Sequence, residues 1–321
     1  MMQFEKELQG IKNVAIAGHI RPDGDCVGAC VGLWHYIRDN YPQIEVDIWL
    51  EKPDEKYAVL EGYEAIRQID GQERVYDLFI AVDCAAYDRL GEASRYFEKA
   101  ARTICVDHHI SNTGYADENM ICADASSTCE VLCSMMEMDK ISTACASALY
   151  TGIAHDTGVF QYSCTSPATM RMAADLMEKD IPYTFLVSHT FYKKTYRQNQ
   201  VLGKALLESM RVMGGFCVVS VMRRREMEFF GVTPKDLDGI VSQLKLTEGV
   251  EVAIFLYETG PMEYKVSLRS QEKVDVSKVA SYFGGGGHVR AAGVTMKGTF
   301  HDIVNNLTLH IEHQMAEQEE Q

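Results

Sequence analysis

Three short apolar runs, each ending at acidic or imidazole side chains, constrain the fold of this chain more than any other feature. The runs cover residues 14–17, 76–82 and 102–106. Short apolar runs of this kind, bounded by turn residues, are typical of buried strands. In an open parallel sheet, ligands bind just outside the carboxyl ends of the strands. The pattern therefore predicts an α/β fold with a polar site along one edge of a parallel sheet.

The loop after the first run carries one imidazole and two carboxylates. Its sequence is GHIRPDGD, residues 18–25, and it includes His19, Asp23 and Asp25. The glycine and the proline break the strand into a loop. Because the two aspartates alternate around Gly24, both carboxylates can turn toward one point. Such a donor set suits a divalent metal such as Mn²⁺, although the same residues also occur in plain turns.

Three further segments end in the same kind of residue. Asp83 ends the second run, residues 107–109 (Asp-His-His) end the third, and a predicted helix over 144–154 ends in His155 and Asp156. A single element that ends in an acidic or imidazole residue is common, but four such elements in order are hard to explain as solvent-exposed turns. The set favours one functional site over four unrelated loops.

These four motifs, with Asp-His-His as the third, resemble the DHH phosphoesterase superfamily. That superfamily includes the single-strand exonuclease RecJ, family II inorganic pyrophosphatases and the nanoRNA-degrading enzymes of the NrnA type. Residues 283–293, FGGGGHVRAAG, resemble the glycine-rich signature of the DHH-associated C-terminal domain. The resemblance covers nearly the whole chain, and its motifs are specific only in combination.

Position by position, the resemblance implies two divalent metal ions, preferentially Mn²⁺. The implied ligands are His19, Asp23 and Asp83 for the first ion, and Asp25, Asp83, His108 and Asp156 for the second. Asp83 would bridge the two ions and belongs to the implied catalytic set. Asp107 is expected to orient an imidazole. His109 is expected to face the substrate and to donate to a phosphate oxygen or the leaving oxygen, with an ordinary loop histidine as the alternative.

The glycine-rich segment predicts substrate contacts. Glycines let a backbone approach an anion closely, so Gly285, Gly286 and Gly287 could lay N–H groups against a phosphate. His288 would add a donor, and Arg269 and Arg290 are candidates for a second phosphate. A flexible loop would be the default interpretation of a glycine run without the metal motifs.

The length of 321 residues predicts two domains. We expect a parallel-sheet DHH metal-binding catalytic domain over residues 1–188 and a linker helix over 189–212. A smaller α/β substrate-binding domain would follow over 213–321. The active site would lie in the cleft between the domains, which could open and close.

Charge and composition limit the partners. The net charge is −15, from 31 basic and 46 acidic side chains. This excess disfavours a long nucleic-acid track, which would need many cationic contacts, but it allows a short anionic substrate at one local site. No apolar run is long enough to span a membrane, and the charged N-terminus lacks a signal core, so we expect a cytoplasmic protein. The sequence allows a homodimer.

The ten cysteines are expected to be reduced thiols. No Cys-x-x-Cys pair occurs, which disfavours a structural zinc site. Most lie in apolar runs, where a reduced cysteine behaves as a small hydrophobic residue.

The resemblance implies an enzyme of the NrnA kind. Such enzymes hydrolyse very short RNA oligonucleotides, releasing mononucleotides, and take the terminal phosphate from 3'-phosphoadenosine 5'-phosphate (pAp). Alternatives are a phosphodiesterase for linear dinucleotides such as pApA and a family II-type pyrophosphatase, which would lack the glycine-rich signature. A nucleotide-binding regulator without catalysis is a further class, which the complete set of metal motifs disfavours.

Overall fold

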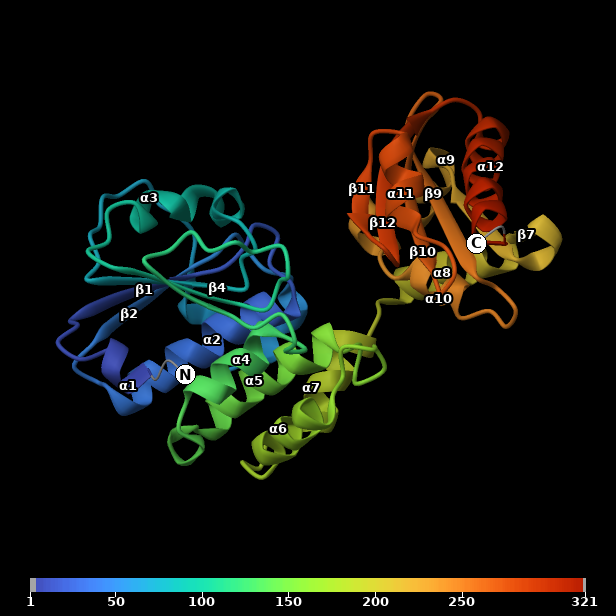
Figure 1. Ribbon diagram of the computed structural model, residues 1–321. Coiled ribbons are helices and arrows are strands. Elements are labelled where there is room, and N and C mark those ends of the chain that lie inside the picture. Colours follow the sequence, from blue (N-terminus) through green and yellow to red (C-terminus); the bar gives the residue numbers. More distant parts are fainter. Residues whose placement is uncertain (1–3, 320–321) are drawn as a thin grey trace. The chain divides into compact units, whose positions relative to one another are not determined.

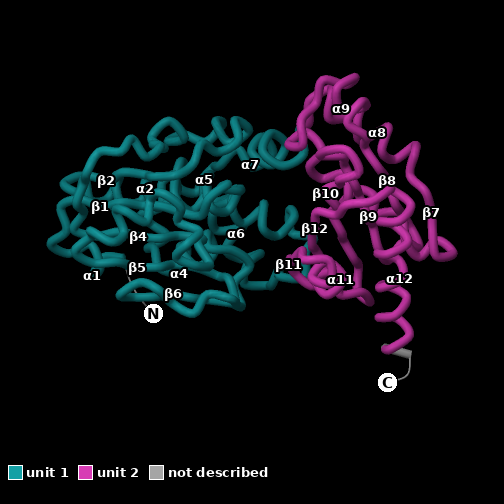
Figure 2. The backbone as a smooth tube through the Cα atoms, turned by 90° about the horizontal axis from the view of Figure 1, so that it is seen from above, with its two compact units in different colours: residues 1–193 teal, residues 194–321 magenta. Residues whose placement is uncertain are grey.

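The computed structural model describes residues 4–319 of the chain. Its contacts divide the chain into two compact units, residues 1–193 and 194–321 (Figure 2). The predicted limits of the catalytic domain, linker and substrate domain remain predictions. Residues 1–3 and 320–321, which those limits include, lie outside the described part of the chain.

The first unit is built on a parallel six-stranded sheet in the order β3-β2-β1-β4-β5-β6 (Figure 1). Its strands are β1 (Asn13–Ala17), β2 (Glu45–Trp49), β3 (Ile66–Arg67), β4 (Leu78–Val82), β5 (Thr103–Asp107) and β6 (Glu118–Ile121). All five pairings are parallel. The three apolar runs form β1, β4 and β5, which confirms the predicted strands and fold class.

Helices and short turns cover the sheet. The helices are α1 (Phe4–Glu7), α2 (Gly24–Asn40), α3 (Ser94–Phe97), α4 (Thr128–Met135), α5 (Thr143–Asp156), α6 (Pro167–Met177) and α7 (Tyr183–Val187). The single-turn elements are η1 (Glu55–Val59), η2 (Tyr63–Ala65), η3 (Tyr87–Ala93), η4 (Met138–Lys140) and η5 (Ser188–Tyr192).

Alternate residues of each strand pack into different cores, as the period of two dictates. Ile16 and Ile80 pack into the core shared with α2, α4 and α5, whereas Ala15 and Phe79 face the aromatic core under η3 and α3. Figure 1 shows α2, α4 and α5 on one face of the sheet and α3 on the other. Both faces are therefore covered, which leaves the carboxyl edge of the sheet for a site.

The apolar residues after Ser127 predict a helix that reaches Met138, but α4 ends at Met135 because Met136 is extended. Strand β6 was not predicted, because it is short, only partly buried and begins with two polar residues.

The second unit contains a mixed six-stranded sheet in the order β11-β12-β10-β9-β8-β7. The strands are β7 (Met210–Val212), β8 (Cys217–Met222), β9 (Val252–Gly260), β10 (Glu263–Ser270), β11 (Gly286–His288) and β12 (Ala291–Lys297). Strands β8 and β9 pair in parallel and the other neighbours pair antiparallel. This sheet confirms the predicted second α/β domain.

Helices lie on both faces of this sheet as well. They are α8 (Tyr196–Leu207), α9 (Arg224–Phe230), η7 (Pro234–Leu237), α10 (Ile240–Lys245), α11 (Val276–Tyr282) and α12 (Phe300–Glu319), with the short turn η6 (Met213–Gly215). Residues of α8, α9 and α10 form one core with the sheet, and residues of α11 and α12 form the other. The residues over 234–244 predict a single helix, but it is broken at Gly239, whose φ is 82°. Within the predicted linker helix over 189–212, α8 ends at Leu207.

All ten cysteines are free, as expected for reduced thiols. Among the residues described, none of the helices combines the length and the apolar character that crossing a membrane requires.

Candidate metal centre and active site

Asp83 stands between two groups of metal-type donors at the carboxyl edge of the parallel sheet. It directly follows β4, is 2% exposed and has a left-handed backbone with φ 52°. A strained backbone of this kind is often found at functional sites. Its Oδ2 lies 3.5 Å from His19 Nε2, and its Oδ1 lies 3.8 Å from His108 Nε2. The two oxygens of one carboxylate therefore face two different histidines.

The first group consists of His19, Asp23 and Asp83. His19 Nε2 lies 3.7 Å from Asp23 Oδ1. Its Nδ1 lies 2.8 Å from the carbonyl oxygen of Ile20, which places the proton on Nδ1 and leaves Nε2 free to bind a metal. Arg89 Nη2 also lies 3.1 Å from Nδ1, but a protonated Nδ1 cannot accept from it. Asp23 in addition caps α2, accepting from the N–H groups of residues 25 and 26.

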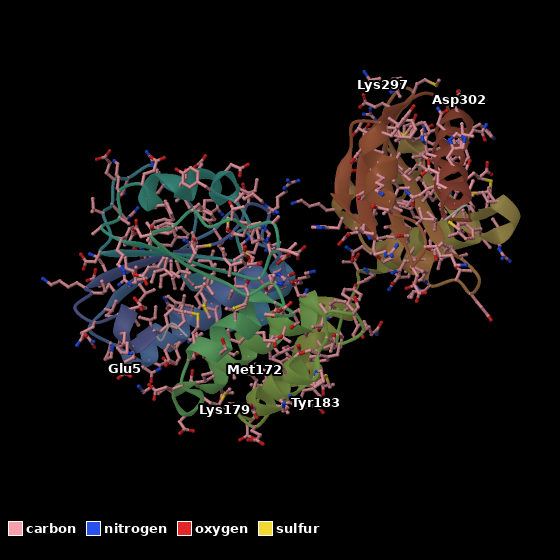
Figure 3. The ribbon with its side chains drawn as sticks, in the orientation of Figure 1. Glu5, Met172, Lys179, Tyr183, Lys297 and Asp302 are labelled. Atoms are coloured by element: carbon pink, nitrogen blue, oxygen red, sulfur yellow. The ribbon has the colours of Figure 1, made fainter. Side chains whose placement is uncertain are left out.

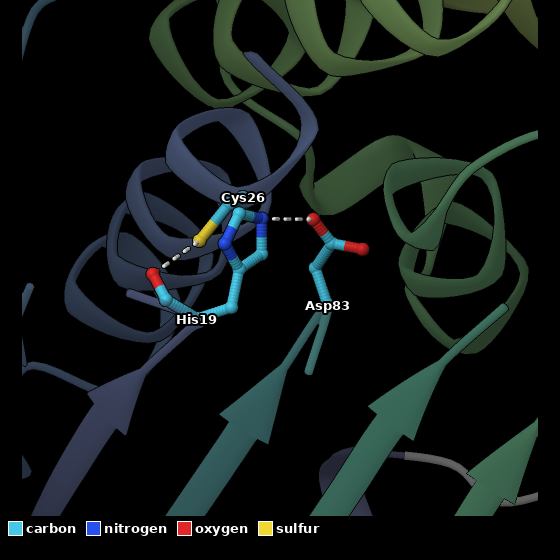
Figure 4. Close-up of side chains that lie close together, drawn as sticks. All are labelled: His19, Cys26 and Asp83. Atoms are coloured by element: carbon cyan, nitrogen blue, oxygen red, sulfur yellow. Dashed lines mark hydrogen bonds and ion pairs between the residues drawn. The ribbon is translucent and has the colours of Figure 1, made fainter. Parts of the chain in front are cut away.

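Cys26 is also near this group. Its Sγ lies 4.0 Å from the carbonyl oxygen of His19, and its donor atom groups with those of His19 and Asp83 (Figure 4). Burial raises the pKa of the Cys26 thiol well above its usual value. The imidazole and the carboxylate are therefore the donors of this trio that suit a hard divalent ion.

The second group consists of Asp25, His108 and Asp156, whose donor atoms lie within 4.8 Å of one another. His108 Nε2 lies 3.1 Å from Asp156 Oδ2. Asp156 is the last residue of α5, and Asp25 lies in the first turn of α2. The neighbouring His155 takes no part, because its Nε2 bonds instead to Thr190 Oγ1 at 3.0 Å.

The electrostatics of the two groups favour a bound cation. Burial lowers the pKa of His19, but the carboxylates of Asp23 and Asp83 outweigh it and raise the pKa to about 12. Burial and the neighbouring carboxylates, Asp83 first, raise the pKa of Asp25 well above its usual value. Several buried carboxylates thus compete for positive charge, which a divalent ion can supply in place of protons.

His109 lies beside Asp83, with 3.7 Å between its Nδ1 and Asp83 Oδ1, and is held by a chain of hydrogen bonds. Its Nδ1 lies 2.8 Å from Asp107 Oδ1, and Asn112 Nδ2 donates to Asp107 Oδ2 at 2.7 Å. Asp107 is fully buried, and its hydrogen bond raises the pKa of His109. The proton on Nδ1 leaves Nε2 as the atom with which His109 can reach a substrate. The resemblance implied an orienting role for Asp107, whereas no motif pointed to Asn112.

Thr128 is a site residue that sequence analysis missed. Its hydroxyl donates to Asp83 Oδ1 at 3.1 Å, and its backbone N–H donates to Asp25 Oδ2 at 2.7 Å. The spacing of Ser127 and Glu130 is that of a capping box, and only half of that box forms. Ser127 accepts from the N–H of Glu130, while the Glu130 carboxylate accepts from the N–H of Ser126 instead. No local signal could reveal the contact with Asp83, because 45 residues separate the two.

Gly152 of α5 allows a helix backbone to approach the second group closely. A Cβ at this position would lie 2.7 Å from Asp25 Oδ1 and 2.2 Å from Cys129 Sγ. Gly28 of α2 serves the same packing, since its Cβ would lie 2.6 Å from the carbonyl oxygen of Ala148. The contact between α2 and α5 therefore depends on glycine at both positions.

The predicted substrate-contacting residues lie together in the second unit. Arg269 on β10 is opposite Ala291 on β12, which is opposite His288 on β11. Arg290 immediately precedes β12, and His288 and Arg290 are exposed. Three cationic or imidazole side chains therefore come from adjacent segments at one level of this sheet.

The glycines of this segment also have an internal role. A Cβ at Gly285 would lie 2.4 Å from the carbonyl oxygen of Gly293, and one at Gly287 would lie 2.4 Å from that of Ala291. They permit close packing of the 285–287 segment against β12. Gly286 meets nothing within 4 Å. Phosphate contacts from residues 285–287 remain a prediction.

The donor set in the first unit fits divalent metal ions. Ligand bonds of about 2.0–2.2 Å place two ligands of one ion roughly 3.0–3.5 Å apart. The separations within the two groups and the distance from His108 to Asp83, 3.1–3.8 Å in all, are close to that range. Imidazole and carboxylate donors without a thiolate suit Mn²⁺ or a similar ion.

The chain matches two known domains. Residues 13–153 match the N-terminal domain of the DHH family, and residues 214–316 match the DHHA1 domain. The first match contains His19, Asp83 and His108, and the second contains His288.

Similar proteins extend over most of the chain. It is 28% identical over 311 residues to a probable bifunctional oligoribonuclease and PAP phosphatase NrnA of Streptococcus mutans, covering 91% of this chain and 93% of that protein. It is 27% identical to the bifunctional oligoribonuclease and PAP phosphatase NrnA of Thermus thermophilus, covering 89% and 84%. Among solved structures, an exopolyphosphatase-related protein from Bacteroides fragilis shares the fold, with a TM-score of 0.87, 24% identity and coverage of 97% and 94%.

Proposed function

Because the chain belongs to the DHH family and carries a DHHA1 domain, we propose that this phosphoesterase hydrolyses very short RNA oligonucleotides and pAp with two Mn²⁺ ions. The names of its relatives from Streptococcus mutans and Thermus thermophilus, oligoribonuclease and PAP phosphatase, support this substrate class. RNA oligonucleotides would be degraded to mononucleotides.

The observation that carries the proposal is the position of Asp83. Its two oxygens face His19 and His108, which belong to different donor groups. A carboxylate placed in this way can bind both groups' ions at once. Two such ions, when bound, activate a water nucleophile and neutralise charge on the phosphate.

His109 is proposed to act on the substrate. Asp107 holds its Nδ1 and so directs Nε2 outward. A raised pKa keeps the imidazole protonated at higher pH, and a protonated imidazole can donate to a phosphate oxygen or to the leaving oxygen. Asn112 prevents Asp107 from turning away, because it occupies the second carboxylate oxygen.

The second unit is proposed to hold the phosphates of the substrate. Arg269, His288 and Arg290 come from adjacent segments, and the arginines can bind phosphate with two parallel hydrogen bonds. The closing of these residues over the metal groups stays a prediction. Three such contacts are few for a nucleic-acid-binding protein, and the net charge of −15 repels a longer strand.

The experiment compares kcat/KM for a dinucleotide, an RNA 24-mer of the same base, pAp, pApA and pyrophosphate, each with Mn²⁺ at fixed salt. We expect the dinucleotide to be cleaved most efficiently among the RNAs, and pAp to release phosphate. Neutralising single-strand phosphates gives a salt slope of about 0.7 each. Three contacts therefore limit the slope of log KM against log salt to about 2.

An Asp83→Asn variant purified in the same way controls for contaminating nucleases. Equal or higher efficiency on the 24-mer, with a steeper salt slope, would contradict the short-substrate proposal. Preferential hydrolysis of pyrophosphate would favour a family II-type activity instead.

A further inference from the structure

A pocket beside His19 has no role in the function proposed above. It has a volume of about 240 Å³ and lies at the carboxyl ends of β1 and β2. His19 forms part of its wall, while His19 Nε2 faces Asp83 in the metal centre. One residue of the proposed metal centre therefore also borders the pocket.

Hydrogen bonds between the loops that surround the pocket give it a fixed shape. The N–H of Ile20 donates to the carbonyl oxygen of Arg89 at 2.8 Å, and the N–H of Leu50 donates to that of Arg67 at 3.1 Å. The N–H of Arg21 donates to the carboxylate of Glu51, also at 2.8 Å. The segments after β1, β2 and β4 and the end of β3 are thus tied together in pairs, so the pocket is preformed and does not depend on a ligand.

Its lining combines apolar side chains with charged ones. Trp49, Leu90 and Ala93 line it and are at most 4% exposed. The charged side chains of the lining are Glu51, Glu92 and Lys52, all exposed, and the Lys52 ammonium also pairs with Glu55. Two carboxylates against one paired ammonium disfavour a phosphate group, whereas the apolar part of the lining favours a flat, uncharged group. The volume is smaller than the roughly 300–1,000 Å³ of pockets for drug-sized ligands, so it suits one ring system.

We propose that this pocket is a subsite for one nucleobase of the substrate. The inference rests on the proposed function, since it supplies the base-binding part of the same site. The phosphate attached to that nucleoside would lie at the metal groups, next to His19. Apolar contact with Ile69 and Leu90 would hold the base, and the exposed amide of Gln68, which can both donate and accept, is placed to meet its polar edge.

Tryptophan fluorescence provides a test that does not require turnover. The chain has two tryptophans, so a Trp34→Phe background leaves only Trp49, which lines the pocket. With Mg²⁺ in place of the paramagnetic Mn²⁺, we expect AMP to change the emission of Trp49 in a saturable manner. Ribose 5-phosphate, which has the phosphate but no base, should leave it unchanged. An equal response to both ligands, or no response to AMP, would overturn the subsite.

Two pocket variants extend the test to catalysis. Ala93→Leu adds volume at the pocket wall, and Ile69→Ala removes an apolar contact from a partly buried wall residue. Because Ala93 also packs in the aromatic core, Ile69→Ala carries the test if Ala93→Leu is destabilised. Val75→Ala is the matched control, because Val75 is 66% exposed and does not line the pocket. Changes of one or a few methylenes in an apolar pocket alter kcat/KM by about 10- to 200-fold, so we expect a loss in that range for a dinucleotide with either pocket variant.

Dinucleotides with one abasic position, made in both orders, distinguish a loss of base binding from a general loss of activity. For the order in which the pocket receives no base, the pocket variants and the wild-type protein should show equal kcat/KM. If the variants lose the same factor on intact and abasic substrates, the subsite is wrong even though the protein cleaves dinucleotides. If the wild-type protein cleaves no dinucleotide but AMP still changes the Trp49 emission, the proposed function fails and the subsite stands.

Discussion

Replacing Thr128 by valine tests how the bridging carboxylate is oriented. The substitution removes the hydroxyl that donates to Asp83 Oδ1 at 3.1 Å and keeps the shape of the side chain. It also keeps the backbone N–H that donates to Asp25, so one of the two carboxylate contacts of this residue is lost and the other remains. Thr128 and Asp83 are both buried, so water does not readily replace the lost donor.

The expected magnitude follows from the charge and burial of the contact. A hydrogen bond to a charged group contributes about 1.5–3 kcal/mol, and loss of a partner that orients a metal ligand weakens metal binding by about 10- to 100-fold. We therefore expect the weaker of the two Mn²⁺ dissociation constants of Thr128→Val to rise by a factor in that range. An opposing effect exists, because a carboxylate oxygen without its donor carries more negative charge and attracts a cation more strongly.

The assay is calorimetric titration of metal-free protein with Mn²⁺, together with the Mn²⁺ concentration that gives half-maximal turnover. Thr128→Ser keeps the hydroxyl and should restore tight binding. Thr151→Val is the matched control, since Thr151 is equally buried but its hydroxyl donates to the carbonyl oxygen of Ser147. Unchanged or tighter Mn²⁺ binding by Thr128→Val would refute the orienting role, as would equal weakening in Thr151→Val.

Three further changes address other parts of the site. Asp83→Ala should abolish Mn²⁺-dependent turnover more completely than loss of any other single ligand, because Asp83 faces both donor groups; full turnover would rule out the two-metal assignment. Gly152→Ala would place a Cβ 2.7 Å from Asp25 Oδ1 and should lower the free energy of unfolding, measured by urea denaturation, by about 1–3 kcal/mol. Gly203→Ala is the control, because its Cβ meets nothing within 4 Å, and it should not destabilise the protein. Equal stability of the two variants would contradict the packing argument. His288→Ala should greatly reduce turnover while both Mn²⁺ ions remain bound, and a parallel loss of metal would place His288 among the metal ligands.

The sequence alone was enough to place the metal-type residues at the ends of secondary-structure elements. The apolar runs before His19, Asp83 and Asp107 form buried strands because their composition and length allow little else. Parallel strands end at the same edge of a sheet, so side chains that follow them come together without any knowledge of distant contacts. Local pattern and strand direction therefore carried this part of the prediction.

Local pattern failed where a role depends on two segments meeting. The segment around Ser127 looked like an ordinary helix start, and it is one, since Ser127 caps α4. The glycines of 285–287 looked like a phosphate loop, but Gly285 and Gly287 also pack closely against β12. In both cases the residue type is compatible with a local structural role and with a role in the site, and neighbouring residues in the chain do not distinguish the two roles.

Tertiary packing decided those uses. Thr128 reaches Asp83 and Asp25 only because α4 packs beside α2 at the carboxyl edge of the sheet, which depends on how the buried faces of these helices fit together. Gly152 likewise acquires its importance from the close approach of α5 to Asp25. Interactions between near neighbours in the chain determine strands and turns. The hydrogen bond from the Thr128 N–H to Asp25, in contrast, depends on close packing of segments about a hundred residues apart.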